Sequence, residues 1–343
     1  MTSSILIIYT GGTIGMKEDP VDGTLKPFDF SQIMEEVPEL GKFGVRIDAH
    51  TFDPLIDSSD VEPSLWIALA QLIRDRYDDY DGFVILHGTD TMAYSASALS
   101  FMLEGLTKAV VFTGSQLPIG VPRTDGKENL ISAVEIAAAK DQDGHARVPE
   151  VCIYFDSRLL RGNRSTKYSA EAFDAFASPN CPPLAEAGIR IRYNTPLIRK
   201  PVYWDAQLRV QTRLDTRVSI LKVHPGMTAQ VMRSVVNDPL TRACILETYG
   251  SGNALSKDWF LDALREAAQQ GKILLNVTQC PSGTVNMDLY ATGATLKRAG
   301  VLSGADITTE AALGKLFSLM GRSDDNARVK TMLEKNLCGE ITK

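Results

Sequence analysis

Short apolar runs alternate with segments of helical period along the first half of the chain. Residues 5–9, 83–86 and 151–155 have the length and composition of strands buried in a parallel sheet. From Met92 onward the apolar residues recur on one helical face, which predicts a helix after the second of these strands. Further strands are expected at 45–52 and 108–113, and further helices at 30–36, 63–77 and 126–140.

The alternation resumes at residue 218, after an irregular stretch that is rich in arginine and proline. Strands are expected at 218–223, 243–247 and 273–277, and helices at 228–236, 256–270, 289–299, 308–320 and 325–336. This pattern predicts an α/β protein with an N-terminal doubly wound, mainly parallel sheet and a second, smaller α/β domain. We expect the first domain at 1–190, a linker at 191–217 and the smaller domain at 218–343.

Composition narrows the possible partners. The net charge of −6 and the lack of a basic run argue against nucleic acid as a partner. The longest apolar runs are too short to span a membrane, and the N-terminus lacks the features of a secretory signal. Five scattered cysteines without a CxxC pair favour reduced thiols, so we expect a cytoplasmic protein.

Polar residues follow several of the expected strands. Thr13 comes after Gly11 and Gly12, residues 57–60 read Asp-Ser-Ser-Asp, and Thr89 and Asp90 follow the strand at 83–86. Parallel strands end at one edge of the sheet, where α/β proteins bind ligands. Threonine and aspartate are also ordinary helix caps, so capping remains an alternative for these residues.

The residue types at these strand ends suit acyl transfer. A threonine hydroxyl is a weak nucleophile and needs a base beside it. A lysine in the basic segment 161–167 is a candidate for that role, although the segment also fits a solvated loop or a phosphate clamp. Metal chemistry is not expected, because the four histidines do not have ligand spacing.

Two sequence blocks closely resemble the signature blocks of L-asparaginases, in particular the bacterial cytoplasmic type I group. They are YTGGTIGM at 9–16 and LHGTDTMAYSASALSFML at 86–103. The resemblance extends over nearly the whole chain through LIDSSD, GSQLP, RGNRSTK, FDAFASPN, YGSGNA and NVTQC. Two separate catalytic blocks in the right order make this match specific.

The resemblance implies hydrolysis of L-asparagine to L-aspartate and ammonia without a cofactor or a metal. Thr13 matches the family's nucleophile, which forms an acyl-enzyme with the side-chain amide. Thr89, Asp90 and Lys167 match the group that surrounds the scissile amide. The matching substrate-binding positions are Gly12, Asp57, Ser58, Ser59, Gly88 and Ser115, and Ser115 matches a backbone contact near the leaving ammonia.

The family implies a homodimer or a tetramer of paired dimers, with Asn253 near a neighbouring subunit's site. Many members also carry a tyrosine on the loop after the nucleophile, and this chain has no tyrosine between Tyr9 and Tyr77. We expect another phenol to replace it, with Tyr290 as the leading candidate. A role for Tyr290 as a packed helix residue is an equal alternative.

Some type I members bind a second asparagine at a regulatory site. The matching positions here are Glu247, Thr248, Tyr249 and Cys280. Some regulated relatives carry an arginine where this chain has Glu247, and reversing that charge removes a partner for the effector's carboxylate. We therefore expect weak or absent cooperativity.

Other functions remain open at this point. A mixed glutaminase–asparaginase differs by one methylene of substrate, which is worth only about 1–3 kcal/mol. The asparaginase-like subunit of an archaeal tRNA amidotransferase carries an additional N-terminal domain, for which a first strand at residue 5 leaves no room. A non-catalytic module for binding asparagine or aspartate conflicts with the four filled catalytic positions.

Overall fold

The computed structural model describes residues 3–18, 25–27 and 36–342, which divide into two compact units. Unit 1 comprises residues 1–178 and 182–212, and unit 2 comprises 179–181 and 213–343. Residues 182–212 therefore belong to unit 1, where part of the stretch expected as a linker forms short strands. None of the helices in the described ranges is long and apolar enough to cross a membrane.

Unit 1 is built on an eight-stranded sheet with the order β13-β12-β9-β8-β7-β5-β1-β4. Strands β4, β1, β5, β7 and β8 are parallel, whereas the pairs β8–β9, β9–β12 and β12–β13 are each antiparallel. The main strands are β1 (Ser4–Tyr9), β4 (Arg46–Thr51), β5 (Gly82–Leu86), β7 (Ala109–Thr113), β8 (Val151–Phe155) and β9 (Arg158–Arg161). The edge strands are β12 (Ala185–Glu186) and β13 (Arg192–Tyr193).

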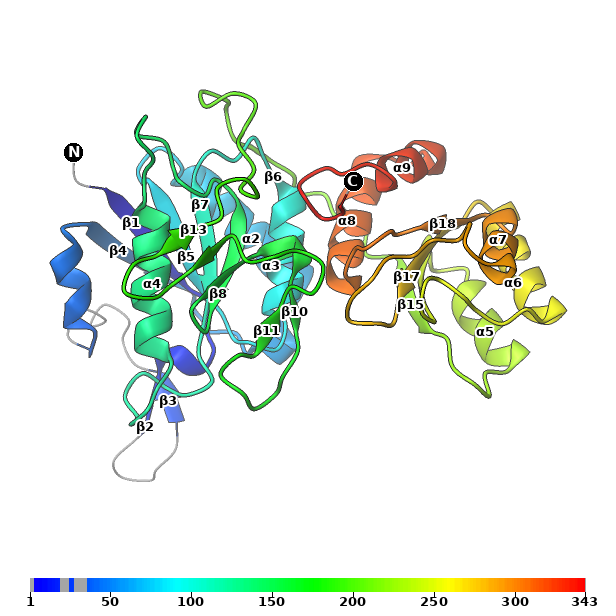
Figure 1. Cartoon of the computed structure of the whole chain (residues 1–343), viewed down its shortest axis with the longest axis horizontal. Helices are drawn as coiled ribbons and strands as arrows, with labels where there is room; N and C mark the ends of the chain where they lie inside the picture. The colour runs from blue at the N-terminus through cyan, green and yellow to red at the C-terminus, as the bar shows by residue number, and fades with distance from the viewer. Residues whose placement is uncertain (1–2, 19–24, 28–35, 343) are drawn as a thin grey trace. The chain divides into compact units, whose positions relative to one another are not determined.

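Helices cover both faces of this sheet (Figure 1). Helix α4 (Gly126–Ala138) packs on one face against β1, β5, β7 and β8, whereas α2 (Pro63–Asp75) and α3 (Met92–Met102) pack against each other. The apolar side chains of β1 alternate between the faces, so that Ile5, Ile7 and Tyr9 join the core beneath α4. This arrangement confirms the predicted doubly wound sheet.

Short elements complete unit 1. They are η1 (Thr13–Gly15), β2 (Met16–Glu18), β3 (Leu25–Pro27), η3 (Pro38–Phe43), η4 (Ser58–Asp60), β6 (Leu103–Glu104), η5 (Gly162–Arg164), β10 (Thr166–Lys167), β11 (Phe176–Ala177) and β14 (Arg209–Val210). Strands β2 and β3 pair antiparallel in the segment that resembles the family's loop. The helix expected at 30–36 lies almost entirely outside the described residues.

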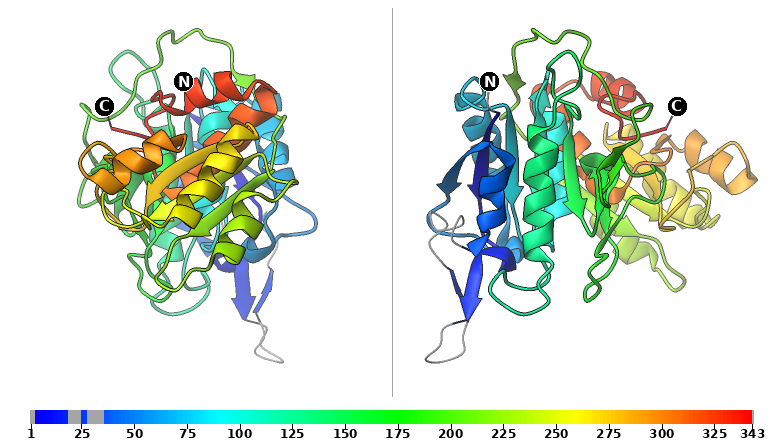
Figure 2. Two further views of the ribbon diagram at one scale, coloured as in Figure 1. Left: turned by 90° about the vertical axis from the view of Figure 1, so that its right-hand side faces the viewer. Right: turned by 60° about the vertical axis from the view of Figure 1, so that its left-hand side comes forward.

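Unit 2 contains a four-stranded parallel sheet in sequential order, β15-β16-β17-β18. Its strands are β15 (Val218–Lys222), β16 (Ala243–Thr248), β17 (Ile273–Thr278) and β18 (Val301–Ser303). Helices α5 (Ala229–Val236) and α6 (Asp258–Gln269) pack together on one face (Figure 2). The other helices are α7 (Ala291–Arg298), α8 (Thr309–Arg322) and α9 (Asn326–Leu333). This unit confirms the predicted smaller α/β domain.

Candidate active site

A cavity of about 430 Å³ opens where the parallel strands of unit 1 end. Strand β1 lies between β4 and β5, so the turns after these three strands meet at one edge of the sheet. The residues that line the cavity are Tyr9, Gly11, Gly12, Thr13, Met16, Leu55, Ile56, Asp57, Ser58, Gly88, Thr89, Asp90, Gln116, Lys167 and Ala170. The cavity therefore brings together the predicted nucleophile and the predicted Thr-Asp-Lys group.

The turn that carries Thr13 depends on backbone contacts that only glycine allows. Gly12 has φ +92°, and a Cβ there would lie 2.6 Å from the backbone of Gly88. Gly11 has φ +137°, and a Cβ there would overlap the carbonyl oxygen of Ile56 even more closely. Thr13 then begins η1 and is partly buried in the cavity wall.

Lys167 joins Thr89 and Asp90 across the cavity. Its Nζ atom donates to Thr89 Oγ1 at 2.9 Å and to Asp90 Oδ1 at 2.5 Å. The lysine side chain is 20% exposed and the aspartate side chain 59% exposed, so this ion pair faces the open side of the cavity. The N-cap of α3 is Thr91, so Thr89 and Asp90 are not its capping residues.

The turn after β4 presents a fixed carboxylate. Asp57 accepts hydrogen bonds from Ser59 N at 2.9 Å and Ser59 Oγ at 2.8 Å. The backbone bond and then the hydroxyl bond lower the pKa of Asp57, so it is an anion at neutral pH. Asp57 also caps η4, and Ser58 lies buried beside it against Gly88.

A buried hydrogen-bond chain supports the turn between β5 and α3. Trp66 Nε1 donates to Ser95 Oγ, Ser95 donates to His87 Nε2, and His87 Nδ1 donates to the carbonyl of Gly88. Burial lowers the pKa of His87 to about 4, so the ring is neutral at pH 7 and can accept at Nε2. This chain of hydrogen bonds holds in place the Gly88 peptide that precedes Thr89.

Ser115, Gln116 and Tyr9 add detail to the site that was expected from the sequence. Ser115 is buried and is not among the residues that line the cavity, and its hydroxyl has no hydrogen-bond partner among the described residues. Its neighbour Gln116 lines the cavity instead and donates to the carbonyl of Ala172 at 3.0 Å. Sequence reasoning missed Gln116, which directly follows the selected Ser115, and Tyr9, which comes three residues before the selected Gly12.

The remaining predicted site residues belong to unit 2. Asn253 Oδ1 accepts from Thr292 Oγ1 at 2.5 Å. Tyr290 is 55% exposed and is the N-cap residue of α7.

The predicted regulatory residues lie at and after the ends of β16 and β17. Glu247 accepts from Thr309 Oγ1 at 2.7 Å, and buried Thr248 donates to Asn276 Oδ1 at 2.6 Å. The Tyr249 hydroxyl is buried without a hydrogen-bond partner among the described residues, whereas Cys280 is exposed.

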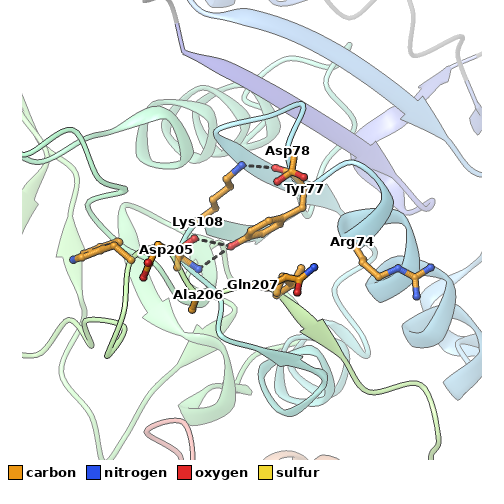
Figure 3. A pocket seen from close by; sticks show the side chains of 10 residues that line it. Arg74, Tyr77, Asp78, Lys108, Asp205, Ala206 and Gln207 are labelled. Carbon is orange, nitrogen blue, oxygen red and sulfur yellow. Dashed lines mark hydrogen bonds between the residues drawn. The ribbon is translucent and has the colours of Figure 1, made fainter.

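Unit 1 also contains a second cavity of about 430 Å³, which is shown in Figure 3. The polar groups at its wall bind one another and the backbone. Lys108 Nζ donates to the carbonyls of Tyr77 and Tyr80, and the Tyr77 hydroxyl is hydrogen-bonded to Thr107. Burial lowers the pKa of Lys108. The candidate nucleophile, carboxylates and lysine gather instead at the first cavity.

One exposed turn brings Asp141, Asp143 and His145 close enough to share a cation. The Asp141 carboxylate already accepts the backbone N–H groups of Asp143 and His145, and Lys200 pairs with it at 3.2 Å. These bonds account for the cluster as a turn.

Known proteins match the chain over almost its full length. The family model Asparaginase, N-terminal, covers residues 4–199, and Glutaminase/Asparaginase C-terminal domain covers 217–333. L-asparaginase 1 of Escherichia coli K12 is 46% identical over 99% of this chain and 98% of its own length. The 60 kDa lysophospholipase of Homo sapiens is 40% identical, and the match covers 98% of this chain and 61% of the human protein.

Solved structures agree with this assignment. The crystal structure of L-asparaginase I from Vibrio cholerae matches with a TM-score of 0.88 and 40% identity over 100% of both chains. L-asparaginase from Thermococcus kodakarensis matches with a TM-score of 0.89 and 30% identity over 99% of both chains. The chain therefore belongs to the asparaginase family of amidohydrolases.

Proposed function

We propose that this protein hydrolyses L-asparagine to L-aspartate and ammonia through an acyl-enzyme on Thr13. The observation that carries the proposal is the sharing of the Lys167 ammonium between Thr89 and Asp90, on the same cavity as Thr13. A hydroxyl nucleophile with a second hydroxyl and a lysine beside it can cleave an amide through an acyl-enzyme. This reaction uses no cofactor.

In the first half of the reaction, Thr13 Oγ1 attacks the side-chain amide carbon of asparagine. The C–N bond then breaks, the nitrogen leaves as ammonia with the proton taken from the threonine, and an ester remains. In the second half, water adds to the ester and the bond between the acyl carbon and Thr13 Oγ1 breaks. The oxygen of water stays on the released aspartate, and a proton from that water restores the Thr13 hydroxyl. Thr89 and Lys167 move the protons, and turn amides stabilise the negative oxygen in both halves.

The α-amino and α-carboxylate groups of asparagine carry opposite charges, so each needs a different kind of partner in the cavity. Asp57 and Asp90 are suited to the α-amino group because both are exposed aspartates that line the cavity. Ser58 and Ser59 belong to the turn that we assign to the α-carboxylate. We assign backbone contacts to Gly12, Gly88 and Ser115, as the family resemblance implies.

We also propose a homodimer or tetramer of paired dimers, in which Asn253 and Tyr290 approach a neighbouring subunit's site. The exposure of Tyr290 is compatible with this role. The five cysteines are free thiols, which favours a cytoplasmic location.

Ammonia release against substrate concentration tests the proposed function. We expect turnover of L-asparagine, much less of L-glutamine, and a loss of at least about 1,000-fold in Thr13→Ala. Thr10→Val is the matched control, because the hydroxyl of Thr10 binds the carbonyl of Leu86 at 2.9 Å. It is expected to retain turnover within a few fold.

The comparison of L-asparagine with L-glutamine distinguishes the proposed asparaginase from the alternative functions. Equal turnover of both amides would identify a mixed glutaminase–asparaginase. Binding of aspartate without ammonia release by the wild type would contradict the proposed enzyme and favour a binding module. Unchanged turnover in Thr13→Ala would contradict the acyl-enzyme on that residue.

A further inference from the structure

Tyr9 belongs to a core strand, but its side chain also reaches the active-site cavity. It ends β1 and faces the same core as Ile5 and Ile7, yet it also lines the active-site cavity. Its side chain is fully buried. The phenol thus reaches from the sheet toward the turn that carries Thr13.

Two contacts tie this phenol to that turn. The Tyr9 hydroxyl donates to the carbonyl of Gly12 at 3.3 Å. At Gly15, the last residue of η1, a Cβ would overlap the Cζ and Oη atoms of the same phenol. The ring tip therefore fills the space between the residue before Thr13 and the end of its 3-10 turn.

The other side of Gly12 faces the backbone of Gly88, so closely that a Cβ on Gly12 would lie 2.6 Å from it. We propose that Tyr9 is a positioning residue that orients Thr13 for attack by holding the Gly12 peptide and the η1 turn against Gly88. This inference rests on the proposed amidohydrolase function. It assigns a role to a residue that does not itself touch the reacting atoms.

The protonation state of Tyr9 fits a donor and does not fit a base. Burial raises the pKa of its phenol to about 12, so the hydroxyl keeps its proton through the neutral range. It can therefore donate to the Gly12 carbonyl throughout that range. The effect of Tyr9 on the rate should accordingly be the same from about pH 6 to pH 9.

Tyr9→Phe removes the donor and keeps the ring. We expect kcat to fall about tenfold, because a nucleophile that is held less firmly spends less time in the attacking geometry. The Kd for the product L-aspartate should change less than about twofold, since aspartate binding does not need an aligned nucleophile.

Tyr154→Phe is the matched control. Tyr154 is also a fully buried tyrosine of the same core, and its hydroxyl donates to Glu128 at 3.0 Å. The two variants should lose similar thermal stability, and only Tyr9→Phe should lose kcat. An equal fall of kcat in both would overturn the inference, as would a Tyr9→Phe enzyme with wild-type kcat.

A second variant tests the same contact from the other side. Gly15→Ala must displace the phenol, so we expect kcat to fall by at least as much as in Tyr9→Phe. The double variant should be no slower than Gly15→Ala alone, because the bond to Gly12 is already lost. Multiplying losses would overturn the proposed coupling. Wild-type protein that releases no ammonia would instead overturn the proposed function, and the inference with it.

Discussion

The two parallel sheets of this molecule differ in how their strands are ordered. In unit 1 the chain passes from β1 to β4 on one side and then returns to β5 on the other side of β1. In unit 2 the strands from β15 to β18 follow one another across the sheet without a reversal. Crevices open where the order reverses, and the Thr13 cavity lies at the reversal in unit 1.

The turns at the two carboxyl edges also use their polar groups differently. In unit 1, glycines bring the turns together by their backbones, which leaves Thr13, Asp57 and Asp90 on the cavity wall. In unit 2, the corresponding side chains bind one another, as Thr248 does with Asn276. The same type of fold therefore leaves polar side chains on a cavity wall in one unit and pairs them with one another in the other.

We expect the largest effect from a substitution that breaks the contacts of Lys167 at the carboxyl edge of the unit 1 sheet. Lys167→Met keeps the length of the side chain and removes its charge, so kcat/KM should fall about 100- to 10,000-fold. Lys272→Met is the control in unit 2, because that lysine is buried and its Nζ donates to the carbonyl of Asp238. The control should lose stability and keep kcat/KM.

Initial rates with L-asparagine and thermal melts of both variants provide the measurement. A Lys167→Met protein that retains more than about a tenth of wild-type kcat/KM would argue against a role for this lysine in proton transfer. A comparable loss in Lys272→Met would mean that lost stability explains both results.

The sequence was informative about this edge because strand ends can be read from the apolar runs. Thr13, Ser58 and Thr89 each follow a predicted strand, and the parallel arrangement brings all three together. The role of Tyr9 could not be predicted in this way. Its contacts depend on the path of the chain from Gly12 to Gly15, and an apolar run shows only that Tyr9 belongs to a strand.

Ser115 shows where prediction from strand ends becomes imprecise. It follows β7 as Thr13 follows β1, yet its side chain is buried outside the cavity lining while Gln116 lines it. A shift of one residue changes which side chain reaches an edge, and strand ends are predicted less accurately than that. The sequence therefore predicts that the turn after β7 belongs to the site. Which side chain of that turn faces the cavity depends on the residue at which the strand ends.

The second prediction concerns the neutral histidine beneath the unit 1 edge. The pKa of His87 is lowered to about 4 in the folded protein, against an ordinary value near 6.5. Between these values the unfolded chain binds a proton that the folded protein does not bind. Stability should therefore be lost as the pH falls from about 6.5 to 4, by up to about 3 kcal/mol.

Urea unfolding at several pH values measures this effect. His87→Gln should flatten the pH dependence in that window, whereas His224→Gln, at an exposed histidine of unit 2, should leave the slope unchanged. Equal slopes in wild type and His87→Gln would contradict the assignment of the pH dependence to His87.

The smallest expected effect is at the carboxyl edge of unit 2. The Glu247 carboxylate is negative where some regulated relatives carry an arginine, and it already accepts a hydrogen bond from Thr309. A second asparagine would bring its carboxylate next to that of Glu247, and repulsion between the two like charges would oppose binding. We therefore expect a hyperbolic dependence of rate on asparagine, with a Hill coefficient of about 1.

Glu247→Gln sharpens this last test because it removes the charge and keeps a group that can accept the bond from Thr309. The curve should stay hyperbolic and kcat should change less than about twofold, since the contacts of Glu247 hold together the edge of unit 2 and do not involve reacting atoms. A sigmoidal wild-type curve that becomes hyperbolic in Glu247→Gln would show that this carboxylate takes part in regulation. The two sheet edges would then both bind asparagine, and strand order alone would not distinguish them.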